Sequence, residues 1–82
     1  MTYSDIIIKR ITSICKKKHI NVNQLATMSG MRQSTVNDVL NGTTQNPTLK
    51  TLHRMAIGLG MTVSELLDYP EMNEWTFEKD DK

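Results

Sequence analysis

The sequence has few of the residues that cross-link a chain or anchor it in a membrane. Cys15 is the only cysteine among the 82 residues, so no disulfide can form within the chain, which fits a reducing compartment. No stretch approaches the length of a membrane span, and the start, MTYSDIIIKR, lacks the basic region of a signal peptide. We therefore expect a cytoplasmic protein without a membrane partner.

Metal ligands and catalytic groups are equally scarce. His19 and His53 lie far apart in the sequence and have no cysteine or carboxylate at metal-ligand spacing. Cys15 falls on an apolar helical stripe, which indicates a small core residue. We therefore expect no metal, no cofactor, no small-molecule substrate and no enzymatic activity.

The two parts of the chain carry opposite charge, although the net charge is only +1. Residues 1–64 hold eight bases and two acids, whereas residues 65–82 hold seven acids and two bases. A basic body suits a surface that faces phosphates, but both parts can equally be solvated faces. The lysine run at residues 16–18 has the same two interpretations, because it also complements the dipole at the end of a helix.

Helical periodicity runs through most of the chain, and no segment has a convincing strand pattern. The first helix is expected at residues 5–19 with Ser4 as its cap. Thr62 and Glu65 form a capping box for the last helix, which Pro70 should stop nearby. The sequence thus predicts an all-α fold of five helices in residues 1–69. An acidic tail without helical period follows at residues 70–82.

Residues 21–42 read as two short helices joined by a tight turn. Asn21 begins the first of them as its cap, and Gly30 can take the left-handed conformation that ends it. Val36 and Val39 give the second helix a buried face. A helix, a turn containing glycine and a second helix with a polar outer face form the helix-turn-helix pattern. The second helix of such a motif enters the major groove of double-stranded DNA.

Four polar side chains on the outer face of that second helix are the candidates for base contacts. Gln33 is suited to bidentate pairing with adenine, whereas Ser34 can bond several bases. Asn37 and Asp38 lie one turn further along the same face. Asp38 either accepts a hydrogen bond from the cytosine amino group or is a solvated helix acid without a base contact.

The segment from Ile7 to Leu67 resembles the Cro/repressor-type helix-turn-helix family, also called the XRE family. The resemblance rests on QLATMSG, on STVNDVLNG, on Pro47 before TLKTL and on MAIGLGMTVSELL. It implies a compact five-helix bundle of the lambda-repressor type, with the helix-turn-helix at helices 2 and 3. It also implies a prophage-like, sequence-specific transcriptional regulator, a repressor that binds operator DNA as a homodimer and has no enzymatic activity.

The resemblance further places the start of the second helix against the DNA backbone, where Asn21 and the amide of Val22 would contact phosphates. Other candidates for phosphate contacts flank the recognition helix: Arg32, Thr43, Thr44, Asn46, Thr48 and Lys50. For each threonine of this set, turn and cap chemistry is the competing interpretation.

Three departures from the family pattern involve four positions. Arg32 stands where members often have a capping Ser or Thr, so Ser34, water or a DNA phosphate must satisfy the free amides. Cys15 and Leu40 stand where many members have an ion pair, which predicts a hydrophobic contact in its place. Val22 replaces a glutamine and leaves only its backbone amide for a phosphate.

Apolar residues near the C-terminus predict a surface for a second copy. One recognition helix reads only a few base pairs, and paired half-sites lie about 34–36 Å apart. The expected interface consists of Leu66, Tyr69, Met72, Trp75 and Phe77. The alternative is that Trp75 and Phe77 fold back onto their own domain. A different function also stays open, namely a protein-binding module of the same fold that serves as an antitoxin or anti-repressor component.

Overall fold

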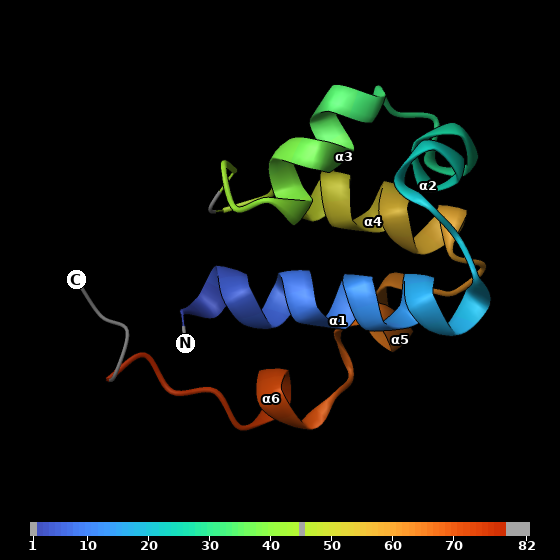
Figure 1. Cartoon of the computed structure of the whole chain (residues 1–82). Coiled ribbons are helices and arrows are strands. Elements are labelled where there is room, and N and C mark those ends of the chain that lie inside the picture. The colour runs from blue at the N-terminus through green and yellow to red at the C-terminus, as the bar shows by residue number, and fades with distance from the viewer. Residues whose placement is uncertain (1, 45, 79–82) are drawn as a thin grey trace.

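The structure is a computed structural model that describes residues 2–44 and 46–78, and within these residues all regular structure is helical (Figure 1). The all-α fold is confirmed, with one helix more than the five expected. The helices are α1 (Tyr3–Lys18), α2 (Val22–Ser29), α3 (Gln33–Leu40), α4 (Leu49–Gly58), α5 (Val63–Leu67) and α6 (Pro70–Asn73).

The additional helix, α6, is a single turn of four residues in the segment that was expected to lack helical structure. Pro70 occupies its first turn, where a missing N–H costs nothing and a fixed φ favours the helix. A helix this short cannot show a 3.6-residue period, so the sequence pattern could not reveal it.

The start of α1 also differs from the expectation, because Thr2 caps this helix and Ser4 lies inside it. The Thr2 hydroxyl accepts a hydrogen bond from the Asp5 N–H (3.2 Å), and the Thr2 N–H donates to the Asp5 carboxylate (2.9 Å). The second of these bonds lowers the pKa of the Asp5 carboxyl. A full capping box therefore sets the boundary two residues earlier than Ser4 would.

The other predicted helix starts are confirmed. Asn21 and Gln24 exchange two hydrogen bonds of 2.8 and 2.9 Å, and Thr62 and Glu65 exchange two of 3.0 and 2.8 Å. Thr48 caps α4 by accepting from the Thr51 N–H (3.1 Å). Local capping chemistry thus fixes where α2, α4 and α5 begin.

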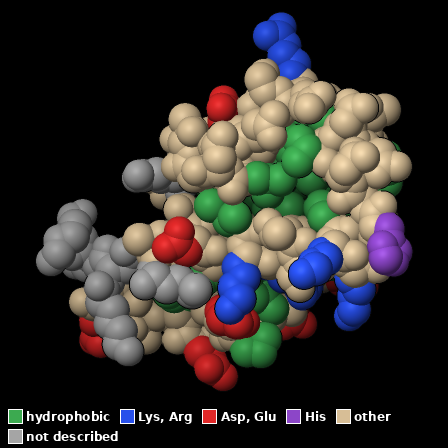
Figure 2. Space-filling view, viewed as in Figure 1, with side chains coloured by type: hydrophobic (Ala, Val, Ile, Leu, Met, Phe, Trp, Pro, Cys, Tyr) green, Lys and Arg blue, Asp and Glu red, His purple; other side chains and the backbone are tan. Residues whose placement is uncertain are grey.

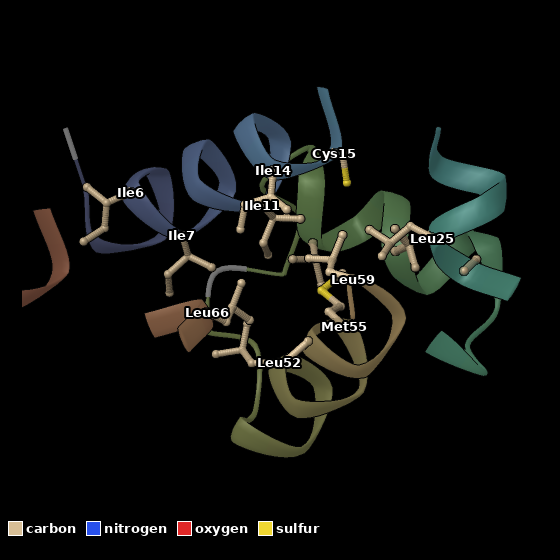
Figure 3. Close-up of a cluster of buried hydrophobic side chains, with 14 residues drawn as sticks. Ile6, Ile7, Ile11, Ile14, Cys15, Leu25, Leu52, Met55, Leu59 and Leu66 are labelled. Carbon is tan, nitrogen blue, oxygen red and sulfur yellow. The ribbon is translucent and has the colours of Figure 1, made fainter. Parts of the chain in front are cut away.

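A single core lies between helices α1 to α5, and Figure 3 shows its aliphatic side chains converging from these helices. Cys15 belongs to this core with 9% of its surface exposed, as predicted, and burial raises the pKa of its thiol. Leu40 is half-buried against the same core. The largest fully buried side chains are Ile6, Ile11, Leu25, Met55, Leu59, Leu66, Val36 and Val39.

Close packing of α2 on α4 holds the helix-turn-helix against the rest of the domain. Gly58 of α4 lies directly against α2: a Cβ at this position would collide with the Ser29 hydroxyl and come within 3.2 Å of the Met28 carbonyl carbon. Ser29 itself is buried, and its hydroxyl has no hydrogen-bond partner among the described residues. The absence of a side chain at residue 58 therefore sets the distance between the two helices.

Arg10 of α1 fastens the C-terminal segment to the domain. Its guanidinium donates to the carbonyls of Glu65 (2.8 Å) and Leu66 (3.0 Å) and lies 4.9 Å from the centre of the Tyr69 ring. The Tyr69 hydroxyl donates to the carbonyl of Ile6 (3.1 Å), and burial raises the pKa of Tyr69 to about 12. As a result α6 lies along the side of α1 that faces away from α3 (Figure 1).

The aromatic residues of the tail pack onto the N-terminus of α1. The Tyr3 ring lies 5.7 Å from the Trp75 ring and 5.2 Å from the Phe77 ring, and its hydroxyl donates to the Met72 sulfur (3.5 Å). This is the fold-back that the sequence left as an alternative. Phe77 nevertheless keeps 59% of its surface exposed.

Two residues of the expected dimer interface lie in the core of their own chain. Leu66 is 1% exposed and Tyr69 is 7% exposed, because Arg10 and Ile6 hold this segment against α1. Their side chains are therefore not available to a second copy, which corrects this part of the expectation. Dimerisation through the remaining residues stays a prediction.

Candidate nucleic-acid interface

The two helices of the motif meet at a turn that Gly30 makes possible. Gly30 has φ +65°, the left-handed region that other residues enter at a cost. The Met31 N–H then donates to the carbonyl of Ala26 (2.9 Å), which is the hydrogen bond of a Schellman-type helix end. After Arg32 the chain enters α3, so three residues redirect the backbone between the helices.

The outer face of α3 carries the four residues predicted to contact bases. Val36 and Val39 point into the core with 0% and 2% of their surface exposed. Within the described chain, the side chains on the opposite face form no hydrogen bond or ion pair and are free to meet a ligand. All four are exposed: Gln33, Ser34, Asn37 and Asp38.

The N-terminus of α3 has no side-chain cap, as expected from an arginine at the N-cap position. Arg32 is extended and its side chain makes no capping hydrogen bond. Its carbonyl accepts from the N–H groups of Thr35 (3.1 Å) and Val36 (3.2 Å). The N–H groups of Gln33 and Ser34 have no acceptor among residues 2–44 and 46–78. Two amide donors and the positive end of the helix dipole are thus available where the helix would approach DNA.

Asn21 and Val22 lie at the N-terminus of α2. The side-chain oxygen of Asn21 is occupied by the cap on Gln24, and the Asn21 N–H is bonded to the Gln24 side chain. Val22 is half-buried against the core. A phosphate contact here would therefore use the backbone amides of the first turn and the Asn21 side-chain amino group.

The loop between α3 and α4 holds the remaining polar candidates. The Thr43 hydroxyl donates to Asn41 (2.8 Å), and the Thr48 hydroxyl donates to Thr51 (3.1 Å) while it caps α4. These two hydroxyls thus take part in the turn and cap chemistry that the sequence left open. Thr44 ties the loop to α3 through its N–H, which donates to the Asp38 carbonyl (2.9 Å), whereas Asn46 is exposed.

The turn after α2, the start of α3 and the N-terminal part of α4 as far as Arg54 enclose a recess of about 470 Å³. Arg32, Lys50 and Arg54 line it without any acid. Arg54 was not singled out in the sequence, although it lies four residues after Lys50 and therefore on the same face of α4. The complete lining is Gly30, Met31, Arg32, Thr35, Lys50, Thr51 and Arg54.

The acids of the C-terminal segment lie on a different side of the molecule. Figure 2 shows acidic side chains at the lower edge, where α6 lies, with basic side chains close to them, and one further basic side chain projecting at the top, where α3 begins. Glu71 lines a groove between α1 and the tail, on the far side of α1 from α3. The acids of the tail thus lie away from the start of α3, whereas basic residues of α1, including Lys9 and Arg10, lie beside them.

The described part of the chain holds no group of three acids, histidines or cysteines that could bind a metal ion. Within the same residues, no helix combines the length and the apolar character that crossing a bilayer requires.

Comparison with known proteins agrees with this geometry. The family model for the Cro/C1-type helix-turn-helix DNA-binding domain matches residues 10–71, which include α2, α3 and the recess. The crystal structure of prophage Lp1 protein 11 is similar to this chain, with a TM-score of 0.79 and 28% sequence identity over 92% of this chain and 99% of that one. No curated protein matches the sequence. The chain is therefore a member of the Cro/C1-type helix-turn-helix family of DNA-binding domains.

Proposed function

We propose that the protein is a transcriptional repressor that binds a specific double-stranded operator by inserting α3 into the major groove. One observation carries this proposal: α3 presents four exposed polar side chains with no partner among the described residues, directly after a helix-turn-helix turn. Membership of a family of DNA-binding domains supports duplex DNA as the ligand of that face, and the major groove is wide enough to admit a helix.

Sequence would be read by the first and second turns of α3. Gln33 can form two hydrogen bonds with adenine, and Asn37, one turn further along, can do the same. Ser34 adds a less selective bond. Asp38 would accept a hydrogen bond from a cytosine amino group. This bond would offset the repulsion between the Asp38 carboxylate and the phosphates only where cytosine is present. Because the carboxylate is exposed and unpaired in the described chain, a purely solvated role remains its alternative.

Backbone contacts would fix the orientation of α3 and carry no sequence information. The residues proposed for these contacts form an arc around the recognition helix, from the start of α2 through the turn and the α3–α4 loop to the start of α4. They are Asn21, Val22, Arg32, Thr43, Thr44, Asn46, Thr48 and Lys50.

A dimer would bring two recognition helices to successive major grooves. The proposed contact surface includes a mostly apolar groove of about 230 Å³ beside the α3–α4 loop, lined in part by Tyr3, Leu49 and Met72. Leu49 is 63% exposed at its edge, and Tyr3 connects the groove to Trp75 and Phe77. The proposed occupant is a second copy, because operator reading requires two half-sites and this surface borders the DNA-facing loop.

Sedimentation of Leu49→Asp and Phe77→Asp variants tests this surface. Both positions are more than half exposed, so the folded monomer should tolerate the change. We expect a dimeric wild-type protein, monomeric variants and weaker operator binding. A wild-type protein that sediments as a monomer, and variants that bind the operator with the wild-type affinity, would contradict the proposal.

The proposed repressor uses no cofactor and no small-molecule substrate, and it acts in the cytoplasm, where the DNA is. A protein-binding module is the second candidate, favoured by two exposed apolar side chains on the packed α2–α4 pair, Met28 (49% exposed) and Ile57 (63% exposed).

Binding of the full chain to a random duplex at a series of salt concentrations separates the two candidates. A DNA-binding protein with six to ten phosphate contacts loses affinity by about 10³–10⁵ between 50 and 200 mM salt. A salt-independent response, or no binding at the lowest salt concentration, would favour the protein-binding module.

A further inference from the structure

Positively charged side chains from two helices line the recess between the start of α3 and the N-terminal part of α4. Arg32 comes from the N-cap of α3, whereas Lys50 and Arg54 come from α4. Residues 32 and 54 are far apart in the sequence, and the packing of α2 on α4 brings them to one recess. No acid lines this space.

None of the three cations has an ion pair or hydrogen bond within residues 2–44 and 46–78. Three like charges around one recess repel each other, and the attraction of an anion placed between them offsets that repulsion. The two threonines of the lining, Thr35 and Thr51, add hydroxyl groups that can donate hydrogen bonds.

The dipole of α3 adds to the same field. Its positive end begins at Arg32, which lines the recess, and its first amides have no acceptor among the described residues. An arginine guanidinium donates in a planar fork that matches phosphate oxygens, and a lysine supplies a point charge. This combination of donors and positive charge suits a single phosphate group.

We infer that the recess binds one phosphate group, supplied by the backbone of a bound duplex, with Arg54 as a positioning residue that clamps it from α4. The inference rests on the proposed function and adds a contact beyond the arc of residues given above. A phosphate held here touches both α3 and α4, so it fixes the angle at which α3 enters the groove. A free phosphate has the same chemistry and is the competing source.

The first arm of the test measures the salt dependence of random-duplex binding for the full chain and for Arg54→Gln. Losing one phosphate contact should reduce the slope of log affinity against log salt by about 0.9, equally on every sequence. Lys9→Gln is the matched control, because Lys9 is an exposed base in the groove between α1 and the tail, away from α3. Its slope should equal that of the wild-type protein.

Equal slopes for Arg54→Gln and the wild-type protein, or equal reductions for Arg54→Gln and Lys9→Gln, would overturn the inference while leaving DNA binding intact. Failure of the wild-type protein to bind any duplex would instead refute the proposed function and the assigned source of the phosphate.

The second arm uses inorganic phosphate and amide chemical shifts, so that it does not depend on DNA. If the recess takes free phosphate, the amides of Gly30, Arg32 and Thr35 shift saturably in the wild-type protein and not in Arg54→Gln. If DNA is the source, these amides shift with the duplex and not with inorganic phosphate at the same concentration. An absence of shifts with both probes would exclude a phosphate site in the recess.

Discussion

Replacing Gly58 by alanine tests whether contact between α2 and α4 determines the position of the helix-turn-helix. In an isolated helix this change would stabilise the structure by about 0.8–1.0 kcal/mol. Here the new Cβ would meet the Ser29 hydroxyl, the Ser29 nitrogen at 3.0 Å and the Met28 carbonyl carbon at 3.2 Å. A rotamer change of Ser29 can move the hydroxyl away, but the two backbone atoms stay in tight contact with the new Cβ unless α2 and α4 move apart by a few tenths of an ångström.

Overpacking of a core costs about 1–3 kcal/mol. We take the upper part of that range because the new Cβ would contact backbone atoms of α2, which move less easily than a side chain. After subtraction of the propensity gain, Gly58→Ala should lower the free energy of unfolding by about 2 kcal/mol. For a domain of this size that lowers Tm by about 10 °C. Urea and thermal unfolding followed by circular dichroism measure both quantities. A variant that is more stable than the wild-type protein would refute the packing argument.

Three further changes test other parts of the structure. Ser29→Ala removes a buried hydroxyl without a partner in the described chain and should stabilise the fold by about 1 kcal/mol in the same assay; a loss of stability would show that the hydroxyl is hydrogen-bonded. His19 has φ +58°, so His19→Gly should raise the free energy of unfolding by about 0.5–1 kcal/mol, and an unchanged value would exclude strain there. The raised pKa of Tyr69 means that its neutral form is favoured in the folded state: this contribution is present below pH 10 and is lost as pH rises toward 12. Tyr69→Phe should therefore be less stable at neutral pH and lose less stability across that window, and parallel pH curves for the two proteins would contradict the assignment.

The sequence predicted the features of the fold that depend on local chemistry. The capping boxes at Asn21 and Thr62 and the break at Gly30 involve residues within three positions of each other, so the sequence states them directly. The exposed face of α3 followed from helical spacing in the same way.

Contacts between distant residues could not be predicted from the sequence. Tyr69 was expected on the surface because nothing in its neighbourhood shows that it bonds to Ile6, 63 residues away, or stacks on Arg10. The recess could not be predicted for the same reason, because Arg32 and Arg54 come together only through the packing of α2 on α4. The single turn of α6 was missed for a different reason, because four residues are too few for a period.

The central claim is that the outer face of α3 reads base pairs, and Gln33→Ala tests it most directly. A preferred operator is first selected from a random duplex pool with the wild-type protein, and the affinities of both proteins for that operator and for a random duplex are then compared at one salt concentration. Loss of a bidentate base contact should cost about 1–3 kcal/mol, about 5- to 150-fold, on the operator and little on the random duplex. Equal losses on both sequences, or no selected operator at all, would contradict the account.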